Sequence, residues 1–425
     1  MSLKLKILSR IKELLNYNIF RYAIILHSFY FILSIVLFFM FFQEKNDFII
    51  FYRVGEVFLN DTENLYNQSY YLWDFRYLPL SALFFIPFGF LDFKISFIVF
   101  NLLNLFLNVI ICIVLYKIII IIKNADHEKD DKRVILYISI YLMGLPHVLN
   151  YIYGQINLYI TLFILISLYI YIKFKSIKWQ FIGSLILGVS IIIKPTAFLL
   201  IPFLIVLNFD LNKRQIKFDF IKTGVRLLGV LLPLSLNFIV FILYPKSWKG
   251  FIETNFTGSN PIALNFSFSI SKLITNFCYF YNIPFSQLII LISIFGFLGI
   301  VGFLVFIFRR FDENSIIYGY TFAILIMLLS YFDSWDHHLL NLTPLVIIII
   351  FNLPRNSEIT TSIKPSFFFF NFFDLAFVGL WYLTYPLFPY NFECTIFLLI
   401  TFYEISKYCF SKKRINSNTN LKGGL

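Results

Sequence analysis

The chain has 425 residues, of which 59% are hydrophobic and only 14% are charged. About a quarter of the residues in a soluble domain are charged, so this composition excludes a soluble enzyme and predicts a polytopic membrane protein. The formal net charge of +12 does not indicate nucleic-acid binding, because the Lys and Arg residues lie in short clusters between apolar runs. The four cysteines show no C-x-x-C spacing, so the sequence predicts neither a disulfide framework nor a zinc site.

The apolar runs predict an all-α transmembrane helix bundle with about twelve crossings. A membrane-spanning helix needs about 17 to 25 apolar residues. The first run, residues 20–42, is too long for a signal peptide and is expected to remain as an uncleaved span. The other spans are predicted at residues 95–122, 134–150, 157–172, 180–193, 196–208, 223–244, 284–308, 315–331, 338–353, 367–385 and 393–410.

The distribution of basic residues predicts which ends of the spans lie in the cytoplasm. With both termini inside, the inner segments carry 23 Lys and Arg residues and the outer segments carry seven. Cytoplasmic loops are enriched in Lys and Arg, so the count favours this orientation. We therefore expect one membrane domain over residues 1–410 and a basic cytoplasmic tail over residues 411–425.

Two outer connections are long, at residues 43–94 and 245–283. The first contains an apolar run at residues 79–91 that holds Pro79 and Pro87 and is too short to cross. We predict that this run forms a helix at the outer interface.

Asp47 follows the first span by about five residues, where a carboxylate just above the membrane can act as a general base. The alternative is an ordinary solvated Asp. Further along the loop, Arg76 and Tyr77 lie among aromatic residues beside the interface helix. The planar guanidinium of Arg76 suits a lipid phosphate, although a snorkelling Arg in an aromatic belt fits the same pattern.

Three later groups of polar residues lie at the ends of predicted spans. Gln155 and Asn157 can hydrogen-bond a sugar, or they can join helices to one another. Lys194 stands in a long apolar stretch, where a charge is costly and is expected to bind an anion unless it snorkels or forms a structural ion pair. His337 and His338 are adjacent and point about 100° apart on a helix, which favours one acting imidazole over a zinc site.

The order of these features resembles the GT-C glycosyltransferases, particularly glycosyltransferase family 87, the polyprenyl-phosphate-mannose-dependent α-mannosyltransferases. The matching features are an Asp after the first span, R-Y-x-P-L, G-Q-x-N, a Lys-Pro in a broken hydrophobic region, and an outer His before L-x-P. They correspond here to Asp47, Arg76 to Leu80, Gly154 to Asn157, Lys194 and Pro195, and His337 or His338 before Leu342 and Pro344.

The resemblance implies a catalytic Asp47 with His337 or His338, and donor-phosphate or substrate binding by Arg76, Tyr77, Gln155, Asn157 and Lys194. It implies a hexosyltransferase that transfers a sugar, expected to be mannose, from a polyprenyl-phosphate-sugar to a lipid- or glycan-linked hydroxyl acceptor at the extracytoplasmic face. The first loop has Asn46-Asp47 rather than a D-x-D pair, so we expect no metal and no cofactor.

The sequence leaves a second class of function open, a transporter that binds an anionic or sugar-linked substrate at a broken helix. That interpretation predicts a midplane site and an internal repeat, and the sequence shows neither clearly. A purely structural protein would not explain Lys194.

The predicted orientation can be tested with single cysteines. Cysteines placed near Asn60 and Asn255 should react with a membrane-impermeant thiol reagent added to intact cells, because both positions lie in predicted outer loops. Cysteines near Lys129 and Lys217 should stay unlabelled until the membrane is opened. Labelling at Lys217 from outside would overturn the orientation.

Overall fold

The computed structural model describes residues 14–123, 127–210, 214–257, 267–310, 314–354, 357–384 and 393–411. Within these ranges the chain is almost entirely helical, with one two-stranded sheet, which confirms the predicted all-α class. The predicted basic tail lies outside the described residues apart from Ser411.

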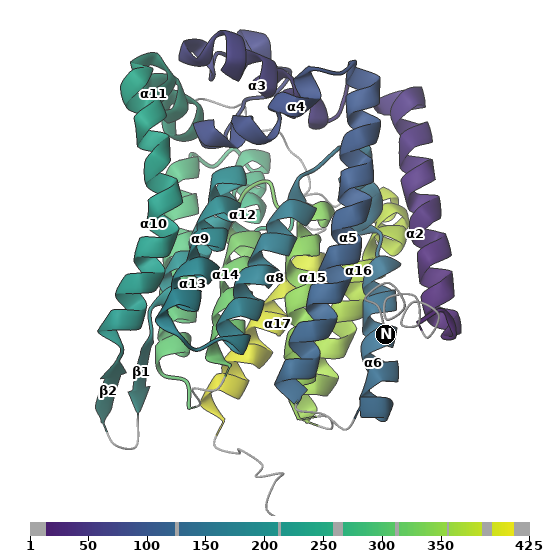
Figure 1. Cartoon of the computed structure of the whole chain (residues 1–425), viewed down its shortest axis with the longest axis vertical. Coiled ribbons are helices and arrows are strands. Elements are labelled where there is room, and N and C mark those ends of the chain that lie inside the picture. Colours follow the sequence, from purple (N-terminus) through teal and green to yellow (C-terminus); the bar gives the residue numbers. More distant parts are fainter. Residues whose placement is uncertain are drawn as a thin grey trace, which may run out of the picture.

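Long helices run side by side and the shorter elements gather at the two ends of the bundle (Figure 1). The bundle helices are α2 (Asn18–Leu37), α5 (Phe93–Lys123), α6 (His127–Leu142), α8 (Asn157–Lys173), α9 (Ile177–Ile193), α10 (Phe220–Leu243), α13 (Gln287–Ile307), α14 (Ser315–Ser330), α15 (Leu339–Asn352), α16 (Glu358–Thr384) and α17 (Glu393–Phe410). Nearly every residue of α14 and α15 is buried, so these two helices form the centre of the bundle.

The peripheral helices have the character of membrane spans. Over the described residues, four helices are long and apolar enough to cross a membrane: α2 with its π-helical extension η1 (Phe38–Phe42), α5, α10 and α13. The bent pair of α6 and α7 (Pro146–Ile152) raises the number to five. These helices expose apolar side chains such as Phe106, Phe238 and Ile289, which suits contact with lipid chains. Twelve crossings remain a prediction.

Short elements cover the end of the bundle where the first loop lies (Figure 1, top). They are α3 (Phe48–Asn60), η2 (Thr62–Asn64), η3 (Gln68–Tyr70), η4 (Pro79–Phe84), α4 (Ile86–Gly89), α11 (Pro245–Ile252), η6 (Glu253–Thr257), α12 (Ile270–Phe280) and η7 (Asp336–His338). The sequence did not predict α3. The predicted interface helix is two short pieces, η4 and α4, each with a proline in its first turn, where the missing N–H is tolerated.

Two predicted spans differ in the structure. The span expected at 134–150 is the pair α6 and α7, which bends by 42° at a break before Pro146. The span expected at 196–208 is the 3-10 helix η5 (Pro195–Leu204), which contains Pro202 and is followed by strand β1 (Leu207–Asp210). Proline removes an N–H donor and clashes with the preceding turn, so a regular α-helix is disfavoured there.

Strand β1 pairs antiparallel with β2 (Gln215–Phe218), with Leu207 opposite Phe218 and Asp210 opposite Gln215. This hairpin, which the sequence analysis did not anticipate, extends from the end of the bundle opposite α3 (Figure 1, bottom).

Helices α9 and α10 pack closely because a glycine faces a proline. A Cβ atom at Gly188 would overlap Cγ of Pro233 and would lie 2.7 Å from the carbonyl oxygen of Val230. Small residues allow membrane helices to approach one another. Gly188 has this role in α9, the helix that ends just before Lys194.

We expect Gly188→Ala to lower the free energy of unfolding in detergent by about 1–3 kcal/mol, the usual effect of overpacking. The matched control is Gly296→Ala in α13, where an added Cβ would meet nothing within 4 Å. Helix propensity alone should make the control neutral or slightly stabilising. Equal unfolding midpoints for the two variants would contradict the packing argument.

Candidate active site

Asp47 is fixed at the start of α3 by the backbone of a distant segment. The N–H groups of Asp47 and Phe48 both donate to the carbonyl oxygen of Tyr153, over 3.0 and 3.1 Å. The next residue, Gly154, has a φ of +61°, and a Cβ there would lie 2.5 Å from Cβ of Phe48. Only glycine adopts this conformation cheaply and also lets the two segments approach.

The same turn supplies a side-chain partner for Asp47. Nε2 of Gln155 donates a hydrogen bond to Oδ2 of the carboxylate. Oε1 of Gln155 is buried and has no hydrogen-bond partner among the described residues. A buried polar atom without a partner costs free energy, so this oxygen is an unmatched acceptor beside Asp47.

The environment of Asp47 changes its acidity. Burial raises the pKa of the Asp47 carboxyl to about 6, Lys194 lowers the pKa, and Asp333 raises it. A general base performs best when its pKa lies near the working pH, and a raised pKa makes Asp47 a stronger base than an ordinary surface carboxylate.

Lys194 lies between α9 and η5, where the backbone is extended, so the predicted break in the helix is present at this residue. Its side chain is only 4% exposed. Nζ donates to Oδ1 of Asn157 over 2.8 Å and lies 2.9 Å from Nε2 of His338. Both partners are uncharged in their ordinary forms, and no carboxylate of the described chain lies within ion-pair distance of Nζ.

A backbone contact determines how His338 faces Lys194. The N–H of Trp335 donates to Nδ1 of His338 over 3.1 Å. A neutral imidazole whose Nδ1 accepts a hydrogen bond carries its proton on Nε2, so His338 offers no acceptor to an ammonium group. Among the described residues, Oδ1 of Asn157 therefore accepts the hydrogen bond of the Lys194 amine.

Asn157 is itself held by other buried amides. Its Nδ2 donates to Oδ1 of Asn150 over 3.3 Å, and Nδ2 of Asn341 approaches its Oδ1 at 3.5 Å. Thr161 donates to Oδ1 of Asn341 over 2.9 Å. This chain of contacts joins α7, α8 and α15 and holds the acceptor of Lys194 in one orientation.

His337 completes the buried part of the site. It is 3% exposed, its ring centroid lies 6.4 Å from that of Tyr153, and it adjoins His338. Its Nδ1 is buried without a hydrogen-bond partner in the part of the chain that the structure describes. Together with Oε1 of Gln155, this nitrogen is a second unmatched polar atom beside the predicted residues.

Arg76 and Tyr77 approach the site from the first loop. Nη1 of Arg76 lies 3.4 Å from Oδ2 of Asp333, and its Nη2 lies 3.9 Å from Oδ2 of Asp74. Tyr77 is part of an aromatic group with Phe51 and Phe75, and desolvation, with Asp47 as the next cause, raises the pKa of its hydroxyl. Arg76 thus has two carboxylates within 4 Å, whereas Lys194 interacts with Asp47 only at longer range.

The structure therefore gathers all eight predicted residues around one place. Asp47 contacts Gln155, Lys194 contacts Asn157 and His338, and His337 adjoins His338. Arg76 pairs with Asp333, and Tyr77 interacts electrostatically with Asp47. None of these contacts tests the role of any residue, so the roles remain predictions.

The sequence analysis missed two charged residues that belong to this group. Asp333 pairs with Arg76 and influences Asp47, and Lys272 on α12 is 6% exposed and interacts electrostatically with Asp333. The sequence signal for Lys272 is its position in the partly apolar run SISKLITNF. The sequence analysis considered this lysine only as one of the positive charges of the outer segments. Over the described residues, no three His, Cys, Asp or Glu side chains gather as a metal site would require.

These residues meet at one end of a helix bundle whose peripheral helices are long and apolar enough to cross a membrane. The chain belongs to glycosyltransferase family 87, whose family model matches residues 75–331, more than half of the chain. It is therefore a membrane glycosyltransferase. No curated protein matches the sequence. The family match includes Arg76 to Lys194, while Asp47, His337 and His338 lie outside it.

Proposed function

We propose that the protein transfers a hexose, specifically mannose, from a polyprenyl-phosphate-sugar to a hydroxyl group of a lipid- or glycan-linked acceptor, with inversion at the sugar carbon. The observation that carries this proposal is the amine of Lys194, buried beside neutral partners and close to Asp47. An isolated buried ammonium is unfavourable, so the site is completed by an anion. The phosphate of the donor is such an anion.

In this proposal each residue of the site has a separate role in the reaction. Asp47 takes the proton of the acceptor hydroxyl, the acceptor oxygen forms a bond to C1 of the sugar, and the bond between C1 and the phosphate oxygen breaks. The bonding pair leaves with polyprenyl phosphate, whose charge is balanced by Lys194 and Arg76. Gln155 orients Asp47, Asn157 orients Lys194, and Oε1 of Gln155 and Nδ1 of His337 are available to the hydroxyl groups of the sugar.

The proposal extends to the membrane arrangement. It places a GT-C-like bundle of twelve crossings over residues 1–410, a cytoplasmic tail at residues 411–425, and the site at the extracytoplasmic face. The donor reaches the site within the bilayer, and Tyr77 lines its approach with Arg76. Family membership favours this transferase over the transporter alternative.

Direct transfer is the decisive experiment. Purified protein should move radiolabel from polyprenyl-phosphate-mannose to a component of a lipid-glycan extract. The matched control is the same reaction with Asp47→Asn. Transfer from a glucose-linked donor alone would overturn the choice of mannose, and transfer from neither lipid donor would overturn the donor class.

The base can be tested by removing its charge. Asp47→Asn keeps the size of the side chain, so expression and donor binding should be nearly unchanged while transfer falls by about 10²- to 10⁴-fold, the usual contribution of general-base catalysis. Because the base acts when deprotonated, the wild-type rate should rise as the pH increases through about 6, the pKa of Asp47, and then level off.

Asp61→Asn is the matched control in the same loop, because Asp61 contacts Asn64 and Tyr70 and no residue of the site. It should keep most of the activity. Asp74 is a less clean control, since it lies 3.9 Å from Arg76. A fully active Asp47→Asn variant beside an inactive Asp61→Asn variant would show that the base is misassigned.

The anion-binding residues can be tested with Lys194→Met and Arg76→Met, which keep an apolar side chain and delete the charge. Loss of a hydrogen bond to a charged group removes about 1.5–3 kcal/mol, or roughly tenfold to 150-fold in donor affinity. Lys194→Met should have the larger effect, because Arg76 is partly neutralised by Asp333. Lys45→Met, at an exposed position near Asp47, is the control. An unchanged KM for the donor in both variants would contradict the assignment.

A further inference from the structure

A second polar region lies at the end of the bundle opposite the candidate active site, beside the β1–β2 hairpin (Figure 1). It is a cavity of about 600 Å³ between the start of α9, the hairpin, the start of α10 and the connection from α13 to α14. The described residues that line it include five basic side chains and a single carboxylate, Asp219. The basic residues are Lys175, Lys217, Lys222, Arg226 and Arg309.

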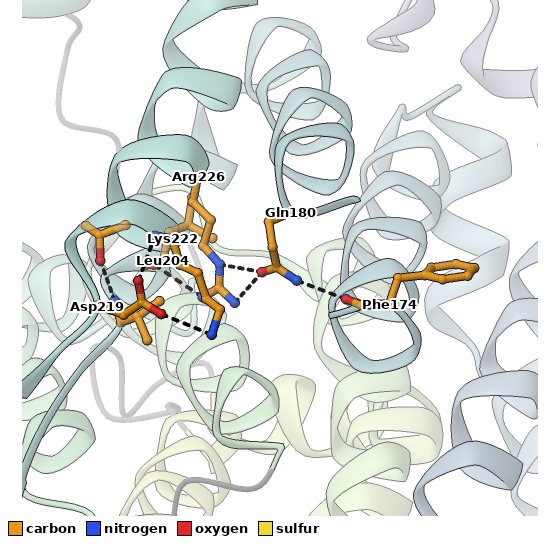
Figure 2. A network of polar contacts seen from close by, with 8 residues as sticks. Phe174, Gln180, Leu204, Asp219, Lys222 and Arg226 are labelled. Carbon is orange, nitrogen blue, oxygen red and sulfur yellow. Dashed lines mark hydrogen bonds and ion pairs between the residues drawn. The ribbon is translucent and has the colours of Figure 1, made fainter. Parts of the chain in front are cut away.

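Polar contacts join residues in the wall of the cavity (Figure 2). Nε and Nη2 of Arg226 donate to Oε1 of Gln180 over 2.8 and 2.6 Å, and Nε2 of Gln180 donates to the carbonyl oxygen of Phe174 over 3.0 Å. Nη1 of Arg226 donates to the carbonyl oxygen of Leu204, and its guanidinium lies over the ring of Tyr171. These neutral acceptors fix the guanidinium without cancelling its charge.

Asp219, the single carboxylate among the described residues that line the cavity, already pairs with Lys222. Oδ1 of Asp219 caps the first turn of α10 by accepting from the N–H of Lys222 over 2.9 Å, and its Oδ2 lies 3.0 Å from Nζ of the same lysine. Lys175 and Lys217 are exposed, and neither has an ion pair with any residue of the described chain. The cavity therefore has an excess of positive charge that attracts an anion.

The rim of the cavity is apolar and faces outward. Ile216 and Phe218 line the cavity, and Ile216 is 67% exposed. Phe220 and Ile221 follow directly in the chain and are 75% and 67% exposed. An inorganic ion would gain nothing from these side chains, whereas a ligand that carries both a phosphate and a hydrocarbon chain would contact the basic wall and the apolar rim together.

We propose that this cavity binds the phosphate headgroup of an anionic phospholipid from the leaflet opposite the active site. Lys175 and Lys217 contact the phosphate, Arg226 provides fixed positive charge behind them, and the acyl chains lie along Ile216, Phe218 and Phe220. Basic pockets between membrane helices are suited to such headgroups. The site is separate from Asp47 and Lys194, and its assignment does not depend on the transfer reaction.

The test is a lipid titration of the full-length protein in detergent, followed by native mass spectrometry with phosphatidylglycerol and, separately, phosphatidylcholine. The wild type should retain phosphatidylglycerol preferentially. The double variant Lys175→Gln with Lys217→Gln should bind it roughly thirtyfold more weakly, since each lysine near an anionic lipid contributes about fivefold. Both side chains are exposed, so the variant is expected to fold, and a monodisperse elution profile checks this.

The matched control is Lys173→Gln with Lys178→Gln, which removes two exposed lysines at the end of α8 and the start of α9 that do not line the cavity. This pair should keep wild-type binding. Equal losses in the two double variants would overturn the proposal in favour of diffuse attraction, as would equal retention of the two lipids. Displacement of the lipid by equimolar inorganic phosphate would show an anion site that is not a lipid site.

Discussion

The burial of the Lys194 amine is the constraint on which the candidate active site depends. A cationic side chain within a membrane domain costs about 2.5–3.5 kcal/mol on insertion scales. The structure places the amide oxygen of Asn157 against this amine, and no carboxylate of the described residues is in direct contact with it. The break between α9 and η5 exists at the same residue, because Pro195 cannot continue the helix and leaves the amine at its end. The anion proposed above would supply the opposite charge that this amine does not meet in direct contact.

The G-Q-x-N motif explains why Asp47 and Lys194 share a site without forming an ion pair. Gly154 permits the close approach of α3, Gln155 turns to Asp47, and Asn157, at the start of α8, turns to Lys194. Gln155 thus contacts the carboxylate and Asn157 contacts the amine, two residues apart in one motif. The elements α3 and α4 cover this end of the bundle (Figure 1).

The residues that the sequence singled out lie close together in the structure, whereas the sequence did not predict several of the elements that position them. Asp47 and Lys194 were found because a charge beside an apolar run is conspicuous. Helix α3 was missed because it lies within a loop assigned by hydropathy alone, and the hairpin was missed because its strands have four residues each. The roles of Asp333 and Lys272 depend on contacts with Arg76 and with each other across distant segments, which no local pattern records.

Helix α9 joins the two polar regions of the molecule. It begins at Ile177, carries Gln180 near the basic cavity, and ends beside Lys194, so its 17 residues span about 25 Å at 1.5 Å per residue. That length is close to the hydrocarbon thickness of a bilayer, about 30 Å. A helix with polar contacts at each end and an apolar stretch between them fits a membrane crossing even though it is shorter than α5 or α10. The same spacing would place the active site at one face of the membrane while the basic cavity meets the headgroups of the other.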